Sequence, residues 1–484
     1  MKNNEVSSQN YQGDDKLLLG LVLAVITFGL FAQTILNIAT TIRTDLGIDV
    51  NASNIAVSIS ALFSGIFIVV IGGLGDKFGR LKITKLGLGL SIIGSLLIAI
   101  SPKGTASFLL IGRIIQGLSS ACIMPSALAI IKAYYQGPGR QRAISFYSFG
   151  AWGGPGLSSI FGGVFASTIG WRWIYILSIL VALTSFILLK DVPESKNASD
   201  KKGRFDFPGM ITFMVAMLAL NIFISQGSSL GWLSPISIGL VAVSLVTFLI
   251  FFRIESRAEH TFIDFNLFNS NTYKGATLSN FLVNSLSGAL IVTLALVQTG
   301  ADLNSLQAGL LTIGYLIGIL IAIRVGEKLL QLWGPRKPMI LGCLITGIGI
   351  FLNSFTLIMT NQYMVVATIG FTFFGVGLGL YATPSADAAL ASIPTEKAGE
   401  ASGIYRMAAS LGAAFGMAIS AALFTGLSMG DVSFIEGIFW GRTDNISIRY
   451  AAIIALLFNV FMALLAIISI LVTIPKEINT EKLK

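Results

Sequence analysis

The feature that most limits the fold of this chain is a series of apolar stretches, each about 20 residues long, separated by polar segments. An α-helix rises about 1.5 Å per residue, so such a stretch matches the roughly 30 Å hydrocarbon layer of a bilayer. The composition agrees, because 54% of the residues are hydrophobic and only 11% are charged. The stretches fall at residues 17–40, 53–74, 83–101, 107–131, 143–167, 170–189, 207–227, 234–252, 275–298, 305–323, 338–359, 363–386, 403–428 and 450–474.

These stretches predict an all-α, polytopic membrane protein with fourteen spans. Lipid offers no partner for backbone N–H and C=O groups, so each span must be helical, and the alternation typical of a barrel strand is missing. The first stretch is as long as a full span and lacks a small-residue cleavage site, so we expect it to be retained.

The distribution of positive charge predicts the orientation. Placing the N-terminus inside puts 26 of the 32 Lys and Arg residues in inward loops and tails, five in outward loops, and Arg113 within a span. Such a bias predicts that both termini lie in the cytoplasm. The membrane is expected to be the inner or plasma membrane of the cell. The net charge of +9 is thus explained by topology, and no basic patch with interleaved aromatics indicates a nucleic-acid partner.

Longer polar segments predict the domain boundaries. The charge-dense segment 190–205 reads as a linker, and a second long inward loop covers 253–273. We therefore expect a six-helix bundle at 1–205, a two-helix insert at 206–258 and a second six-helix bundle at 259–484. A degenerate repeat supports this division, since the segment 72–82 resembles 326–337, with Gly79 aligned to Gly334.

No cofactor or metal is expected. Cys122 and Cys343 lie inside apolar stretches, where a thiol behaves as a small hydrophobe, and the single histidine, His260, lies in a polar loop. A phosphate-binding GxxxxGK[ST] loop is absent from the sequence, which excludes an ATP-driven pump of that type. An enzyme would need paired carboxylates or a histidine-containing triad, so we expect a gradient-driven transporter and no catalytic residues.

The sequence GGLGDKFGR begins at Gly72, at the end of the second apolar stretch. Its glycines permit a tight turn, while Asp76, Lys77 and Arg80 supply charges for a network at helix ends. This motif resembles the signature loop of the major facilitator superfamily; the alternative is an ordinary basic inward turn. The resemblance implies an inner-gate role for Gly72, Leu74, Asp76, Gly79 and Arg80.

The fourth apolar stretch contains LIGRIIQGLSSA, with Arg113 at its fourth position. An arginine inside a span costs roughly 2.5–3.5 kcal/mol on insertion scales, so it faces a polar cavity or a partner. Arg113, Gln116 and Gly117 resemble the second signature of the same superfamily. The resemblance implies that Arg113 takes part in proton coupling, while structural pairing alone is the alternative.

A closer resemblance covers nearly the whole chain. GWRWIYI at 170–176, FDFPG at 205–209 and the pair Gly231–Trp232 resemble the fourteen-span drug:proton antiporter branch. Five further segments resemble the Nor-type quinolone exporters of Gram-positive bacteria: FAQ at 31–33, ALFSG at 61–65, QGLSSACIMPS at 116–126, RVGEKLLQ at 324–331 and GLGLYATPSAD at 377–387. This resemblance implies a major facilitator fold and proton-driven multidrug efflux.

Two departures from the branch pattern affect the mechanism. The acidic residue usual in span one is replaced by Ala32, so a coupling scheme that protonates a carboxylate there cannot operate. In span five, Gly154–Pro155 stand earlier than the antiporter signature places them, and Ser158–Ser159 occupy the expected place. With span one lacking its acid, Asp387, three residues after Pro384, is the favoured proton carrier, followed by Glu327 and Glu400.

The substrate cavity is expected to be mainly apolar, with scattered polar side chains and few acidic ones. Such a cavity suits neutral or zwitterionic amphipathic aromatic compounds. A lipid or glycolipid flippase of the same fold is the main alternative, followed by a facilitator or importer and by a receptor that transports nothing. The expected partners are therefore small amphipathic substrates, protons and the lipid bilayer, with a monomeric chain. The candidate cavity residues are Gln33, Asn37, Gln116, Tyr147, Trp152, Asn280, Asn284, Gln298 and Tyr381.

Overall fold

The computed structural model describes residues 11–195, 206–257, 263–300, 309–358, 360–428 and 445–476. Within these ranges the chain is helical and contains no strand. His260, most of the linker 190–205, the start of the predicted tenth span and the outward segment 429–444 lie outside the described residues.

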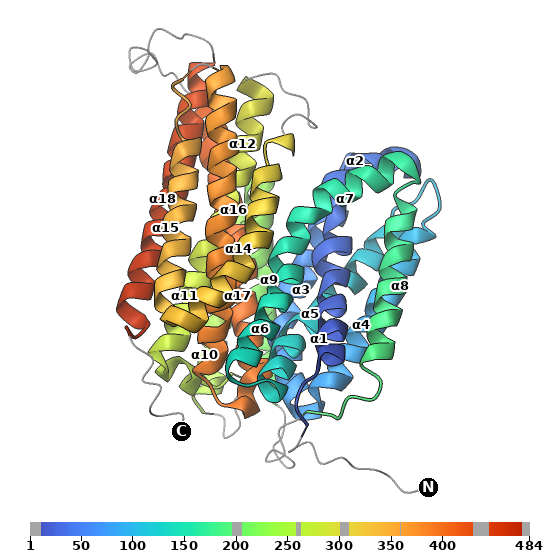
Figure 1. Cartoon of the computed structure of the whole chain (residues 1–484). Helices are drawn as coiled ribbons and strands as arrows, with labels where there is room; N and C mark the ends of the chain where they lie inside the picture. Colours follow the sequence, from blue (N-terminus) through green and yellow to red (C-terminus); the bar gives the residue numbers. More distant parts are fainter. Residues whose placement is uncertain are drawn as a thin grey trace, which may run out of the picture. The chain divides into compact units, whose positions relative to one another are not determined.

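Figure 1 labels the helices in chain order. Up to the end of the expected insert, the elements are α1 Asp15–Ile26, the π-helix η1 Thr27–Phe31, the 3₁₀-helix η2 Ala32–Thr34, α2 Ile35–Leu46, α3 Val50–Phe78, α4 Arg80–Ala99, α5 Ser107–Tyr134, α6 Gly137–Ser148, the π-helix η3 Phe149–Gly153, α7 Gly154–Thr168, α8 Arg172–Leu188, α9 Phe207–Leu230 and α10 Pro235–Glu255. After it come η4 Phe265–Asn269, α11 Asn271–Ser285, α12 Ser287–Gly300, α14 Ile313–Trp333, α15 Arg336–Asn353, α16 Thr360–Ala391, η5 Thr395–Lys397, α17 Ala398–Ser428 and α18 Ile446–Thr473.

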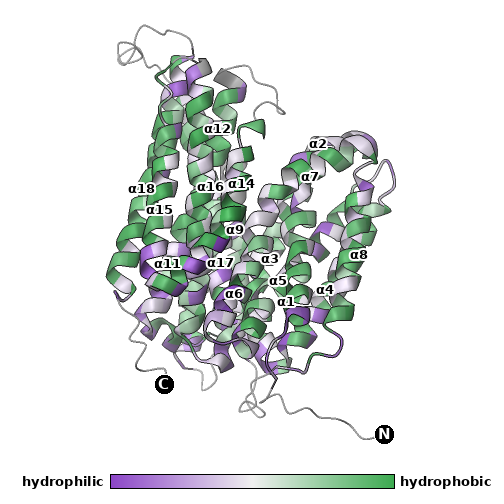
Figure 2. Cartoon of the chain, viewed as in Figure 1, coloured by the Kyte–Doolittle hydropathy of each residue, from purple (hydrophilic) through white to green (hydrophobic). Residues whose placement is uncertain are grey.

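Ten of the described helices are long and apolar enough to cross a membrane, or eleven if the bent pair Ile160–Thr168 and Arg172–Leu188 forms one span. Apolar residues cover most of the length of α15 and α18 (Figure 2). The prediction of a polytopic all-helical membrane protein is confirmed, whereas fourteen spans and the side on which the termini lie stay predictions. Some expected spans differ from a simple apolar helix, because α7 has 15 residues, α8 has 17, and α14 carries Arg324, Glu327 and Lys328.

The chain forms two compact units. The first consists of Met1–Phe223, Leu233–Ser270 and Ala389–Met407, and the second of Ile224–Trp232, Asn271–Ala388 and Ala408–Lys484. The ends of α16 and α17 that adjoin η5 thus pack in the first unit, although most of both helices belongs to the second. The expected domain boundaries at residues 205 and 258 remain a proposal.

The first unit is held together by close helix contacts at small residues. A Cβ on Gly94 of α4 would lie 2.9 Å from the carbonyl oxygen of Gly112 in α5, and a Cβ on Gly112 would lie 2.8 Å from that of Gly94. In a membrane, such backbone proximity replaces the hydrophobic driving force as a source of helix association. Around these contacts lies a cluster of buried side chains from α2, α4, α5 and α8 that includes Ile38, Leu46 and Tyr175.

Two π-helical segments interrupt the first and fifth predicted spans and pack on each other. The backbone N–H of Ala32 donates to the Thr27 carbonyl, and that of Gly154 donates to the Phe149 carbonyl, five residues back in each case. A Cβ on Gly154 would lie 2.7 Å from the carbonyl carbon of Gly29, so this crossing admits glycine alone. π-Bulges are frequent at functional sites because they displace carbonyls from the regular ladder.

Candidate functional site

The carboxylate of Asp76 connects the end of α3 to the first turn of α17, within the first unit. Its Oδ1 accepts hydrogen bonds from Arg80 Nε at 2.8 Å and from the Gly399 N–H at 2.9 Å. Its Oδ2 accepts from the Glu400 N–H at 2.9 Å. These amides are the unpaired donors at a helix N-terminus, where the helix dipole also favours an anion. Gly72 allows the approach, since a Cβ there would lie 3.1 Å from the Gly399 carbonyl carbon.

Arg80, the first residue of α4, completes this connection. Its NH2 group lies 2.7 Å from Asp76 Oδ1, its NH1 group donates to Ser195 Oγ at 3.2 Å, and NH2 also donates to the Thr395 carbonyl. Asp76 is 8% exposed and Arg80 2%. A buried pair needs such extra hydrogen bonds to offset the desolvation of both charges.

The turn between α3 and α4 consists of Gly79 alone. It has a φ of 119°, and a Cβ added there would lie 2.5 Å from Cδ of Glu194. Glu194 caps α4 by accepting from the N–H groups of Leu81 at 2.9 Å and Lys82 at 3.0 Å. Gly334, aligned with Gly79 in the sequence, also has a positive φ, 70°, between α14 and α15. Because α3 ends at Phe78 and α4 begins at Arg80, most of the predicted signature loop is helical, and Asp76 lies in the last turn of α3.

Further polar contacts fix the segment around η5. Glu400 Oε1 accepts from the Asp264 N–H at 2.6 Å, and Asp264 forms an ion pair with Lys397. Lys132, in the last turn of α5, donates to the carbonyl of Leu390 near the end of α16. Asp76 and Arg80 of the signature loop thus belong to a polar network of the first unit that extends through Glu400 to Asp264 and Lys397. We call Asp76, Arg80, Gly399 and Glu400 the α17 clamp.

Arg113 lies in α5 and is 1% exposed. Each of its five N–H donors has an acceptor, and none of these acceptors is a carboxylate. The acceptors are the carbonyls of Ala56 at 2.9 Å, Ala32 at 2.7 Å and Val57 at 3.4 Å, together with Gln116 Oε1 at 2.8 Å and Ser60 Oγ at 2.5 Å. Ala32 is the residue that replaces the usual acid of span one. Arg113 therefore binds the backbone there instead of a side chain.

The side chain of Gln116 forms a hydrogen bond with Arg113. Besides accepting from Arg113, it donates through Nε2 to Ser95 Oγ at 3.2 Å. Ser95 in turn donates to Ser178 Oγ at 3.3 Å, which continues the polar chain from α5 through α4 to α8. The geometry favours a role for Gln116 in orienting Arg113 over direct contact with a substrate.

The other candidate cavity residues of the first unit differ in exposure. Gln33 in η2 is partly buried, Asn37 in α2 is exposed, and Trp152 in η3 is partly buried. Tyr147 in α6 is buried, and its hydroxyl donates to the Met124 carbonyl at 3.3 Å. Their roles as substrate contacts remain proposals.

In the second unit, three hydroxyl groups cluster between α11 and α16. The Tyr381 hydroxyl lies 2.8 Å from Ser279 Oγ and accepts from Ser385 Oγ at 2.8 Å. On the next residue of α11, Asn280 accepts from Asn284 Nδ2 at 2.9 Å through its side chain. Tyr381 and Asn280 are buried and Asn284 is partly buried, whereas Gln298 is exposed near the end of α12.

The candidate carboxylates of the second unit are both buried. Asp387 lies in α16, three residues after Pro384, and is 3% exposed. Glu327 in α14 forms an ion pair with Arg324, one turn earlier in the same helix. Glu400, the third candidate, belongs to the α17 clamp of the first unit.

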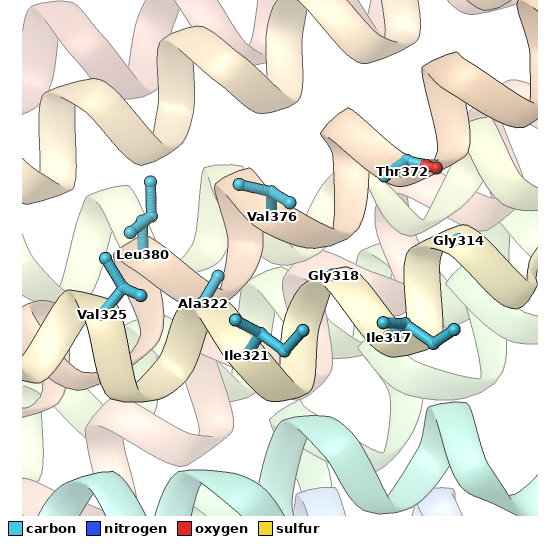
Figure 3. Close-up of a pocket in the computed structure, with 9 residues that line it drawn as sticks. All are labelled: Gly314, Ile317, Gly318, Ile321, Ala322, Val325, Thr372, Val376 and Leu380. Carbon is cyan, nitrogen blue, oxygen red and sulfur yellow. The ribbon is translucent and has the colours of Figure 1, made fainter.

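The second unit also carries an apolar groove of about 490 Å³ between α14 and α16. Figure 3 shows its lining: Gly314, Ile317, Gly318, Ile321, Ala322, Val325, Thr372, Val376 and Leu380. None of the polar residues proposed from the sequence lines this groove. Its hydrocarbon surface suits an alkyl chain or an aromatic ring.

Sequence reasoning missed several residues that the structure places in these networks. Glu194 lies in a segment interpreted as a linker, and Ser60 gives no signal besides being a serine in a span. Arg406, counted with the inward positive charge, lies inside α17, because that helix begins already at Ala398. The apolar stretch 403–428 includes Arg406 and provides a signal for it.

Across the described ranges, no group of three or more His, Cys, Asp or Glu side chains is arranged to hold a metal ion.

Comparisons with known proteins agree with this architecture. The model of the Major Facilitator Superfamily matches residues 19–271 and 275–484. The Quinolone resistance protein NorB of Staphylococcus aureus strain MRSA252 is 47% identical over 475 residues, 98% of this chain and 99% of that protein. The same protein from strain COL shows the same identity and coverage.

Solved structures show the same fold. The human organic anion transporter MFSD10 (TETRAN) matches with a TM-score of 0.62 and 14% identity, over 94% of this chain and 98% of that one. The proton:xylose symporter XylE bound to 6-bromo-6-deoxy-D-glucose matches with a TM-score of 0.62 and 18% identity, over 95% and 96%. The chain is therefore a multi-pass cell-membrane protein that belongs to the Major Facilitator Superfamily.

Proposed function

We propose that this chain exports amphipathic aromatic compounds, quinolones among them, in exchange for protons and by alternating access. The observation that carries the proposal is the 47% identity to Quinolone resistance protein NorB across 98% of the chain. Each proton that moves down the membrane potential supplies about 2.3 kcal/mol per 100 mV, which suffices to drive a small solute uphill.

In this proposal the α17 clamp is the inner gate. Asp76 holds the first turn of α17 by accepting from the Gly399 and Glu400 amides, and Arg80 supports the Asp76 carboxylate through its Nε and NH2 groups. When these contacts break, the segment around η5 is released from the α3–α4 turn. Breaking a buried charge network is costly, so the clamp makes the closed gate a discrete state.

Arg113 and Asp387 are proposed to couple transport to protons. The Arg113 guanidinium is buried with neutral acceptors alone, so its charge is sensitive to any carboxylate or substrate that approaches it. Asp387 is a buried acid in a proline-containing helix, a place where a carboxylate can exchange its proton with a cavity.

The test is a transport panel in a bacterial strain that lacks its own exporters, followed by uptake of a quinolone into inverted membrane vesicles. Vesicles acidified inside are expected to accumulate the drug, and an uncoupler is expected to abolish accumulation. Accumulation that persists after the uncoupler would rule out proton exchange, and no resistance or accumulation for any aromatic compound would rule out drug export.

A lipid or glycolipid flippase is the second candidate. The exposed apolar groove between α14 and α16 favours it, because an acyl chain fits such a surface. Proteoliposomes with a fluorescent phospholipid distinguish the two functions: a flippase exposes the label to an external quencher, whereas a drug exporter leaves the labelled lipid protected.

A further inference from the structure

Arg406 is a charged residue well inside α17. It lies eight residues after Ala398, where α17 begins, which corresponds to about 12 Å along the helix axis. The helix from Thr395 to Ser428 is apolar enough to span the membrane. A cation at this depth is costly, and such residues serve a function far more often than packing.

The hydrogen bonding of Arg406 contrasts with that of Arg113. Arg113 has an acceptor for each of its five donors. The Nε group of Arg406 is buried without any acceptor, and among the described residues the guanidinium takes part in no hydrogen bond or ion pair. The rest of the side chain is partly exposed. A buried charged donor without a partner is costly, so this guanidinium favours the binding of an anion that the chain does not supply.

Two hydroxyl groups accompany this guanidinium in the first unit. The Tyr147 hydroxyl lies within electrostatic range of Arg406; Tyr147 is 2% exposed, and its hydroxyl donates to the Met124 carbonyl. One helical turn before Arg406, on the same side of α17, lies Ser402, whose Oγ is buried without a partner. A guanidinium with an unpartnered serine hydroxyl on the same side of its helix is an arrangement that can recognise an oxyanion.

We propose that Arg406 binds the carboxylate of a transported aromatic compound. This inference rests on the proposed export function and specifies its substrate class as aromatic acids and zwitterions. A planar guanidinium pairs with a carboxylate through two parallel hydrogen bonds, which gives orientation as well as affinity. Its depth in α17 and its proximity to buried Tyr147 favour a solute within the protein over a lipid headgroup at the surface.

The experiment compares an acid with its ester. Ciprofloxacin and ciprofloxacin methyl ester differ in the carboxylate that Arg406 would bind, and their affinities are measured by calorimetry on the purified chain in lipid nanodiscs. The wild type is expected to prefer the acid by about tenfold, which corresponds to about 1.4 kcal/mol. Arg406→Gln is expected to remove this preference by weakening acid binding while ester binding stays the same.

Two further variants control for charge and folding. Arg406→Lys keeps the charge but not the two-pronged geometry, so it is expected to retain a preference of about threefold. Arg142→Gln removes a cation from α6, the helix of Tyr147, where Arg142 is half-exposed and paired with Asp15, and is expected to leave the tenfold preference intact.

The outcomes separate this inference from the export function. If the wild type binds and exports both compounds equally well, or if Arg406→Gln weakens the acid and the ester alike, Arg406 does not bind the carboxylate, although export stands. If the wild type neither binds nor exports either compound, the export function itself fails.

Discussion

The substitution Asp76→Asn removes the charge of the α17 clamp while almost preserving its shape. In the wild type, Oδ1 accepts from Arg80 and Gly399, and Oδ2 accepts from Glu400. An asparagine can place its single oxygen on one side only. Its NH₂ group would then face an N–H donor on the other side.

The expected cost follows from the burial of this network. One charge-assisted hydrogen bond is lost, worth about 1.5–3 kcal/mol. Arg80, 2% exposed, also loses its counter-ion, and breaking one partner of a buried pair costs about 3–5 kcal/mol in total. Taking about 3 kcal/mol, the population in which α17 is released rises by about a hundredfold.

Hydrogen exchange measures this population directly. The Gly399 and Glu400 amides donate to Asp76, so in lipid nanodiscs both are expected to exchange about a hundredfold faster in Asp76→Asn. Drug turnover in proteoliposomes is expected to fall, with little change in drug affinity. Asp45→Asn is the matched control: its ion pairs with Lys103 and Arg172 are partly exposed, and such pairs contribute about 0–1 kcal/mol. Unchanged exchange at Gly399 and Glu400, or a defect in affinity alone, would refute the clamp as a gate.

Three other substitutions test the remaining parts of the site. Arg113→Ala is expected to leave the protein inserted but to abolish proton-dependent efflux, and efflux at the wild-type rate in vesicles would exclude Arg113 from coupling. Gly79→Ala is expected to lower stability by about 1–3 kcal/mol in thermal unfolding, because its φ of 119° is strained for alanine and the Cβ would meet Glu194; Gly104→Ala, with a φ of 82° but open space, should cost less. Asp387→Asn is expected to bind drug yet lose transport driven by a pH gradient, and drug-induced proton release equal to that of the wild type at pH 7 would show that another group carries the proton.

The sequence alone determined the class of fold. Apolar stretches of span length leave the backbone no partner except itself, so a polytopic helical protein followed from hydropathy without any tertiary information. The signature residues Asp76, Arg80 and Arg113 were also identifiable, because charges and glycines at fixed spacings in an apolar background have few explanations.

The partners of these residues were decided by the tertiary structure. Asp76 accepts from amides of α17, more than 300 residues later in the chain. Arg113 binds the carbonyl of Ala32 in the π-interrupted first span. Backbone carbonyls and amides occur at every residue, so no sequence pattern marks which of them a distant side chain will reach.

Arg113 in α5 and Arg406 in α17 show most clearly which properties the sequence determines and which the tertiary structure decides. The sequence places Arg113 within a span and counts Arg406 with the inward positive charge, although the apolar stretch 403–428 includes Arg406. Only the folded chain distinguishes their hydrogen bonding, because helix packing surrounds Arg113 with five acceptors and leaves Nε of Arg406 with none. The hydrophobic pattern fixes how deep a charge lies in the membrane, whereas the packing of neighbouring helices decides whether that charge is satisfied by the protein or is available to a substrate.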